Sequence, residues 1–354
     1  MTILTSTITK NLLILFLIFT GLLYAKDFLM PLAIGGVLAT LFLPFCKWME
    51  GKKVPKVLAV LICVLVLLLA IAGICFLLGW QISALTNDFP LIKQKAIETV
   101  ERIQEYIFDH LGIPAEKQLQ IFKEEQPSVT NILQLMAGSL LNIFTNFILI
   151  LVYIFGLLYY RNHIKQFILK LTPNAERDEM EQVVYSVAKV SQQYLVGLTK
   201  MIVCLWIMYG IGFSIIGVKN AIFFAILCGL LEVVPFIGNI MGTTLTVFVA
   251  AVQGSSLAML GGIVGIYGIV QFVQGWLLEP LIVGPHVKIN PFSTIIALVM
   301  GELIWGIPGI FLAIPITAMI KIICDHIETL KPYGFLIGEI ENRKKTYGIL
   351  KKQN

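Results

Sequence analysis

The 354-residue chain is 58% hydrophobic and only 13% charged, and its mean hydropathy is +0.88. Soluble domains are nearer half apolar and a quarter charged, so this composition excludes a soluble protein and indicates an all-α, polytopic membrane protein. The net charge of +5 is small and comes from lysine-rich segments beside apolar runs, so no nucleic-acid partner is expected.

Three apolar runs predict three membrane segments within residues 1–84. The runs are residues 11–24, 30–45 and 57–80. The second run is followed by Lys47, Lys52, Lys53 and Lys56. By the positive-inside rule this lysine-rich loop is cytoplasmic, and two crossings before it place the N-terminus in the cytoplasm as well. A fourth span is expected at residues 135–160.

Three polar regions lie outside these spans. Residues 85–134 are rich in acids and carry an apolar stripe at helical spacing, which predicts an extracytoplasmic amphipathic helix. Such a stripe needs an apolar partner, and we favour packing within a homo-oligomer. Residues 161–194 contain early acids and predict a cytoplasmic linker helix, either regulatory or simply solvated. Residues 326–354 form a basic tail, which the same charge rule places in the cytoplasm.

Residues 195–325 are expected to form a transport core, in which a fifth span precedes three long apolar runs. Proline and glycine interrupt the first and third runs, at residues 232–238 and 305–309. A proline lacks the N–H and clashes with the preceding turn, so a helix breaks or kinks there. Two topologies stay open: each broken run crosses once with a kink, giving about eight membrane segments, or each is a re-entrant hairpin. We favour hairpins, because each half of about 15 residues is too short to span a bilayer.

The first break places an acid, Glu232, at membrane depth, where an unpaired charge is costly. A helix break beside an ionisable group is typical of a transport site. The alternative is a protonated, hydrogen-bonded glutamate that only serves packing at a proline kink. Gln271 and Gln274 share one helix face and offer neutral donors and acceptors. Glu279, which could pair with Lys288, and Glu302 are either site residues or acids at helix ends.

These observations define two groups of candidate residues. The residues expected to bind substrate or ion are Glu232, Pro235, Gly238, Asn239, Gln271, Gln274, Glu279 and Glu302. The residues expected to act as structural hinges are Pro280, Gly284, Pro291, Gly306, Pro308, Gly309 and Pro315.

No metal or cofactor is expected. The six cysteines form no C-x-x-C pair and most lie in apolar runs, which indicates buried free thiols. The four histidines are scattered in polar segments. The chain also lacks the phosphate-binding motif of ATP-driven transporters. An intramembrane serine hydrolase built on Ser214 is disfavoured, because no histidine lies in a span to serve as its base. The chain is therefore predicted not to be an enzyme.

Residues 190–325 contain a series of short motifs in a fixed order. The motifs are Tyr194-Leu195-x-Gly197, Glu232-x-x-Pro235-x-x-Gly238, Gln271-x-x-Gln274-Gly275, Pro280-x-x-x-Gly284, Asn290-Pro291, Gly306-x-x-Gly309 and Ala313-x-Pro315. In these residues the chain resembles the AI-2E family of transporters. The resemblance implies a multi-pass protein of the bacterial inner membrane. Members of that family are assigned variously to autoinducer-2 export and to sodium/proton antiport.

Three functions stay open at this point. The first is a secondary transporter that exports a small, autoinducer-2-like solute with protons carried by Glu232. The second is a sodium or lithium/proton antiporter, and the third is a non-transporting membrane scaffold. The expected partners are the lipid bilayer, a small solute or ion, and further copies of the chain. The expected location is the bacterial cytoplasmic membrane, with both termini in the cytoplasm.

Overall fold

The computed structural model describes residues 2–86, 94, 129–235, 237–283 and 288–339. In this part of the chain the regular elements are helices, and β-type pairing is limited to an isolated bridge between Ile289 and Gly338. Six of the described helices are long and apolar enough to cross a membrane, and four shorter ones are also apolar. The predicted fold class, an all-α polytopic membrane protein, is confirmed.

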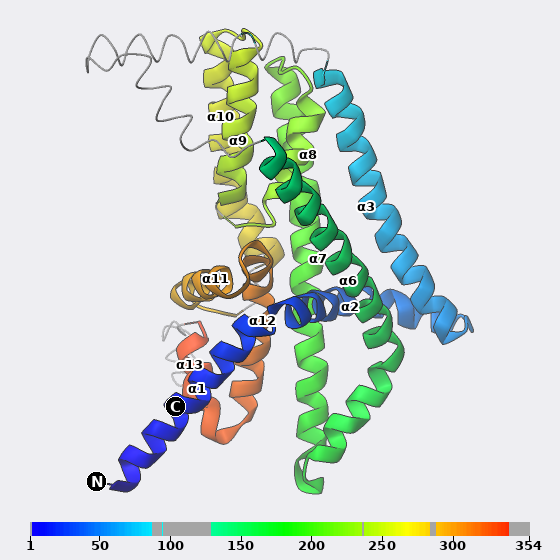
Figure 1. Cartoon of the computed structure of the whole chain (residues 1–354), viewed down its shortest axis with the longest axis vertical. Helices are drawn as coiled ribbons and strands as arrows, with labels where there is room; N and C mark the ends of the chain where they lie inside the picture. Colours follow the sequence, from blue (N-terminus) through cyan, green and yellow to red (C-terminus); the bar gives the residue numbers. More distant parts are fainter. Residues whose placement is uncertain (1, 87–93, 95–128, 236, 284–287, 340–354) are drawn as a thin grey trace, which may run out of the picture. The chain divides into compact units, whose positions relative to one another are not determined.

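The helices follow one another along the chain as shown in Figure 1. They are α1 (Thr2–Tyr24), α2 (Lys26–Gly51), α3 (Lys56–Thr86), α6 (Val129–Leu171), the 3₁₀ turn η1 (Asn174–Glu176), α7 (Arg177–Ile215), α8 (Ala221–Leu231), α9 (Ile237–Val252), α10 (Leu257–Val273), the π-helix η2 (Gln274–Val283), α11 (Pro291–Trp305), α12 (Ile307–His326), the 3₁₀ turn η4 (Glu328–Leu330) and α13 (Lys331–Ile337).

Some helix boundaries differ from the prediction. The linker helix was expected at residues 161–194, but residues 161–171 belong to α6, and the later part continues without interruption into the fifth span as α7. No proline lies in α7, so nothing separates its polar N-terminal turns from its apolar ones. The run that begins at residue 257 was expected to be continuous, yet a π-helix replaces the α-helix after Val273. The amphipathic stripe within residues 85–134, Gly284 and the tail beyond residue 339 lie outside the described residues.

The chain forms two compact units. Unit 1 comprises Met1–Val64, Ile150–Lys200 and Leu278–Asn354, and unit 2 comprises Leu65–Leu149 and Met201–Leu277. Because α3, α6, α7 and η2 each pass from one unit to the other, neither unit is a continuous piece of chain.

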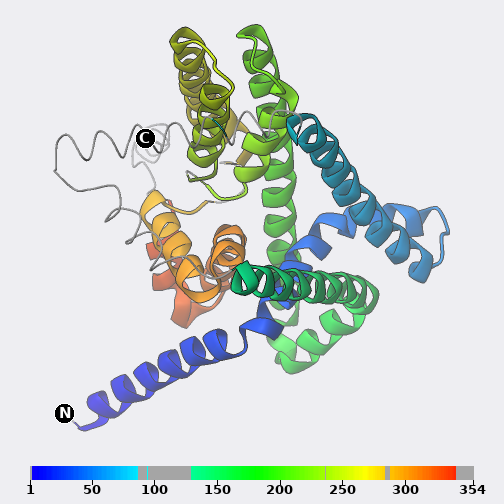
Figure 2. The same ribbon diagram turned by 45° about the horizontal axis from the view of Figure 1, so that its top comes forward.

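In unit 1, α11 and α12 form a closely packed helical pair (Figure 2). Gly306 joins them with a φ of 65°, a conformation that residues with a side chain rarely adopt. A Cβ on Gly309 would overlap the Gly301 carbonyl oxygen, so the two helix backbones touch there. The 15 residues of α11 span about 22 Å and the 20 residues of α12 about 30 Å, against a hydrocarbon core of about 30 Å. The second broken run therefore consists of one short helix and one long enough to cross.

Polar contacts join α2 to its neighbours in unit 1. The Thr40 hydroxyl donates to the Ser191 hydroxyl of α7 at 2.9 Å. Arg161 of α6 forms an ion pair with Glu50 and donates to the Cys46 sulfur at 3.3 Å. Cys46 is one of the six cysteines, all of which are described and free of disulfides. These contacts fix α2 against α6 and α7, whereas α1 projects away from them over most of its length (Figure 2).

In unit 2, small residues bring α7, α8 and α9 close together. The Gly229 backbone lies against the Trp206 ring, and the Trp206 indole donates to the Ile226 carbonyl at 3.1 Å. A Cβ on Gly242 of α9 would lie 3.0 Å from the Cα of Cys228 in α8. Glycine lets helix backbones approach in this way in membranes, where apolar surface alone does not drive helices together. The first broken run is thus a pair of packed helices, α8 and α9.

The buried side of α9 carries small and polar residues, and its exposed side carries large apolar residues. Its buried residues are Gly238, Asn239, Gly242, Thr243, Thr246, Ala250 and Val252. Its large exposed residues are Ile237, Ile240, Met241, Leu245 and Phe248. A helix in water buries the opposite set, because there the apolar face is driven inward. This arrangement is the one expected for a helix surrounded by lipid on its outer side.

Candidate functional site

The candidate site begins where α8 ends. Beyond Leu231 the chain turns through Glu232, with the Val234 amide donating to the Leu231 carbonyl at 2.9 Å. Pro235 interrupts the helix because it has no N–H to continue the ladder. A Cβ on Gly238 would overlap the Leu231 carbonyl oxygen, so only glycine allows this close return of the chain. The break therefore places Glu232 and the first turn of α9 side by side.

A second irregular element completes the site. At Gln274 the α-helix α10 changes to a π-helix of ten residues that includes Pro280. π-Helical turns are rare and are often found at functional positions. Proline cannot donate to the α-helical ladder, so Pro280 is compatible with the departure from α geometry. Gln274 is thus the first residue of the π-helix, and it is only 7% exposed.

Three buried polar side chains form a continuous hydrogen-bonded chain at this position. The Gln274 amide donates through Nε2 to Oε1 of Glu232 at 2.5 Å. The Asn239 amide donates through Nδ2 to Oε1 of Gln274 at 3.0 Å. Glu232 is 4% exposed and Asn239 is 1% exposed. Because Gln274 uses its donor toward the carboxylate and its acceptor toward the amide, it connects the end of α8 to the start of α9.

Further polar side chains lie around the three hydrogen-bonded residues, and the sequence analysis did not identify them as site residues. Thr243 and Thr246 of α9 and Tyr209 of α7 are buried, and the Tyr209 hydroxyl lies within electrostatic reach of Thr243 and Glu232. Among the described residues, three of these buried oxygens make no well-formed hydrogen bond: the Tyr209 hydroxyl, Oγ1 of Thr243 and Oδ1 of Asn239. The spacing of Asn239, Thr243 and Thr246, which places them on one helix face, was the signal that could have identified the two threonines.

Three other predicted site residues, Gln271, Glu279 and Glu302, do not take part in these hydrogen bonds. Gln271, one turn before Gln274, is half-buried and makes no hydrogen bond through its side chain to the described residues. Glu279 and Glu302 are exposed residues of unit 1, and neither forms an ion pair within the described residues, Glu279 with Lys288 included. The structure therefore brings together Glu232, Asn239 and Gln274, next to Pro235 and Gly238, and the hydrogen bonds that join them do not include Gln271, Glu279 or Glu302.

The predicted hinge residues that the structure describes lie at helix breaks or inside helices. Pro291 opens α11 behind Asn290, whose side-chain oxygen accepts from the Ser293 amide at 2.8 Å. Pro308 lies in the first turn of α12, where a missing N–H costs nothing. Pro315 is buried inside α12. Gly306 and Gly309 form the turn and the contact between α11 and α12, and Pro280 lies in the π-helix.

The profile of the AI-2E family transporters matches residues 12–329 of the chain. The chain belongs to the AI-2E transporter family. It is 26% identical over 315 residues to the Bacillus subtilis protein named "Putative transport protein YueF", which covers 85% of this chain and 84% of the relative. It is 23% identical over 332 residues to the Escherichia coli "AI-2 transport protein TqsA", covering 92% of this chain and 94% of the relative. The similarity thus extends over nearly the whole length, including every residue of the candidate site.

Proposed function

We propose that this chain is a secondary transporter that exports a small polar solute resembling autoinducer-2, with protons carried by Glu232. The observation that carries the proposal is the buried chain of Glu232, Gln274 and Asn239 at the junction of a helix break and a π-helix. Buried ionisable and amide groups are costly among apolar helices, and in membrane proteins they generally line substrate or ion pathways. Broken helices at such positions are a recurring feature of secondary transporters.

The polar groups suit a neutral, hydroxyl-rich solute. Asn239, Thr243 and Tyr209 offer an amide oxygen and two hydroxyl groups that make no well-formed hydrogen bond within the described residues. Leaving such groups unsatisfied costs about 1–3 kcal/mol each, so a ligand that bonds to them gains the same amount. A sugar-like molecule presents several hydroxyl groups and can both donate and accept.

Glu232 is the residue that links the site to protons. Its Oε1 accepts from Gln274, and a hydrogen bond of this kind is stronger when the carboxylate is charged. Protonation weakens that bond and gives the carboxyl group a donor of its own. Movement of the Gln274 amide and the charge on Glu232 are therefore coupled, as a proton-driven exporter requires.

The membrane arrangement is part of the proposal. The lysines between α2 and α3 favour a cytoplasmic position for that loop, and both termini on the same side follow from it. The 11 residues of α8 extend only about 16 Å, so this helix alone does not cross a bilayer of about 30 Å. We place α8 and α9 in a re-entrant hairpin whose tip carries the Glu232–Asn239 turn.

A second candidate is sodium or lithium/proton antiport. It is favoured by the oxygen-rich character of the site, where Glu232, Asn239 and Thr243 supply a carboxylate, an amide oxygen and a hydroxyl. Hard cations prefer oxygen ligands of these types. Both candidates use Glu232, and they differ in whether the second substrate is an organic solute or a metal ion.

Flux measurements in proteoliposomes test both candidates. The wild type, Glu232→Gln and the control Glu179→Gln, an exposed acid on α7, are each assayed for autoinducer-2 efflux and for proton movement driven by a sodium gradient. We expect autoinducer-2 efflux from the wild type and the control and at least a tenfold loss in Glu232→Gln. Sodium-driven proton movement with the same dependence on Glu232 would favour antiport. No flux of either kind in the wild type would overturn both and leave a scaffold role.

A further inference from the structure

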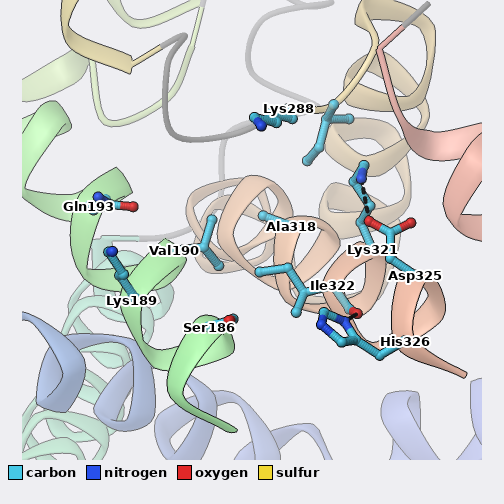
Figure 3. Close-up of a pocket in the computed structure, with 11 residues that line it drawn as sticks. Ser186, Lys189, Val190, Gln193, Lys288, Ala318, Lys321, Ile322, Asp325 and His326 are labelled. Atoms are coloured by element: carbon cyan, nitrogen blue, oxygen red, sulfur yellow. Dashed lines mark hydrogen bonds and ion pairs between the residues drawn. The ribbon is translucent and has the colours of Figure 1, made fainter. Parts of the chain in front are cut away.

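A cavity with a basic lining lies in unit 1, and its lining residues include none of the candidate transport site. It has a volume of about 390 Å³ and is formed by α7, α12 and the segment that follows η2 (Figure 3). Lys189 comes from α7, Lys288 from the segment before α11 and Lys321 from α12. Three cationic side chains from three separate elements therefore converge on one space.

The balance of charge in the cavity favours an anion. Its acidic lining residue, Asp325, is already paired with Lys321 at 2.5 Å. Lys189 and Lys288 are both exposed and form no ion pair within the described residues, although Lys189 lies 5.7 Å from the centre of the Tyr185 ring. Two lysines are thus available to neutralise a ligand, one from α7 and one from the segment before α11 (Figure 3).

His326 and Gln193 also line the cavity with hydrogen-bonding side chains. Nδ1 of His326 lies 2.7 Å from the Ile322 carbonyl oxygen. A carbonyl oxygen only accepts, so Nδ1 carries the proton and donates, which occupies a carbonyl at the C-terminal end of α12. This contact uses Nδ1, so a ligand in the cavity can meet only Nε2 of the His326 ring. Gln193 offers an amide donor beside Lys189.

Apolar and aromatic side chains adjoin the basic residues of the cavity. Val190, Ala318 and Ile322 form an apolar wall beside the lysines. The short helix α13 flanks the cavity, because Gly334 lies directly against Asp325. The outward side chains of α13 are Tyr333, Phe335 and Leu336, which are 60%, 87% and 68% exposed. Aromatic and aliphatic side chains exposed next to basic ones are typical of a segment at the lipid–water interface.

We propose that this cavity binds the phosphate group of an anionic phospholipid, through Lys189 and Lys288, with the lipid chains along the apolar wall. A phosphate diester carries one negative charge and several acceptor oxygens, which two ammonium groups and an amide can satisfy together. Basic pockets between membrane helices near the surface recognise lipid headgroups by this chemistry. A free phosphate compound offers the same group, so the experiment separates the two sources.

Lipid binding to the purified full-length chain in detergent, measured by native mass spectrometry, tests this site. The probes are phosphatidylglycerol, zwitterionic phosphatidylcholine and the soluble compound glycerol 3-phosphate. The variants are Lys189→Gln, Lys288→Gln and both together. The matched control is the double variant Lys170→Gln with Lys200→Gln. Both lysines are exposed, neither lines this cavity, and neither forms an ion pair within the described residues.

We expect phosphatidylglycerol to bind more tightly than phosphatidylcholine. Each single variant should weaken its binding roughly fivefold and the double variant about thirtyfold, while the control double variant matches the wild type. Glycerol 3-phosphate binding with the same dependence on Lys189 and Lys288 would support the phosphate site and assign it to a soluble ligand. Equal binding of the two lipids, equal losses in the pocket and control variants, or no binding of any probe would overturn the proposal.

Discussion

Replacing Gln274 with leucine removes the centre of the buried polar chain while keeping a side chain of similar size. The change deletes the bond that Gln274 donates to Glu232 and the bond it accepts from Asn239. Glu232 and Asn239, the two groups left behind, are only 4% and 1% exposed, so water does not readily replace the lost partner. Each group left without this bond costs about 1–3 kcal/mol, which gives an expected loss of about 2–6 kcal/mol before relaxation.

Gln271→Leu is the matched control for this change. Gln271 is the same residue type one turn earlier, in the last turn of α10, and its half-buried side chain makes no hydrogen bond to the described residues. Its replacement by leucine should alter the free energy of unfolding by no more than about 0.5 kcal/mol, as is usual for positions without such contacts.

Two assays separate a structural effect from a functional one. Thermal unfolding in detergent measures the stability of each variant, and autoinducer-2 efflux from proteoliposomes measures transport. Gln274→Leu should unfold at a lower temperature than Gln271→Leu and should lose transport even at temperatures where it stays folded. If the two leucine variants are equally stable and equally active, the chain through Gln274 contributes to neither property and the reasoning is refuted.

Two other predictions concern the frame of unit 1. Gly309→Ala should destabilise the chain by about 3 kcal/mol or more, because its Cβ would overlap the Gly301 carbonyl. Gly261→Ala is the control, because a Cβ there would meet open space, and it should have little effect or stabilise its helix slightly. Thermal unfolding of the two variants measures the difference. Equal unfolding temperatures would contradict the packing argument. Asn290→Ala should release the C-terminal segment, because Nδ2 of Asn290 donates to the Ile337 carbonyl at 3.0 Å while its oxygen caps α11. Faster chymotryptic cleavage after the exposed Phe335 would show the release, and unchanged cleavage would count against this role for Asn290.

The positions of the two helix breaks could be predicted from the sequence because proline and glycine act locally. Pro235 cannot donate to the helix ladder, and the structure ends α8 and begins α9 on either side of it, whereas Pro315 lies inside α12 without ending it. At the second break, Gly306 ends α11. Both breaks combine proline with a nearby glycine, which is the local signal that distinguishes them from prolines inside a helix, such as Pro315.

The polar chain could be predicted only in part. Glu232 and Gln274 stood out because polar residues are rare in apolar runs, but the bond between them joins residues 42 positions apart and depends on packing. Two equivalent glutamines, Gln271 and Gln274, shared one face of the predicted helix, and nothing in the sequence distinguished them. The helix changes to a π-helix at Gln274, and of the two glutamines only Gln274 is buried. No local signal in the sequence predicted this change of helix type. Tyr209 was missed because a single tyrosine in a span is most often a packing residue.

The residues that fold unit 2 and the residues proposed to bind substrate are interleaved on the same helix face. Gly238 and Gly242 let α9 approach α8, and the positions between and after them carry Asn239 and Thr243. A larger residue at either glycine would separate the helices and move the amide away from Gln274, so stability and transport should fall together. A substitution of Thr243 to valine keeps the shape and removes only a hydroxyl that makes no well-formed hydrogen bond within the described residues. It should therefore leave folding intact and affect only what the site binds, which makes the inner face of α9 the place where substrate specificity can change without loss of the fold.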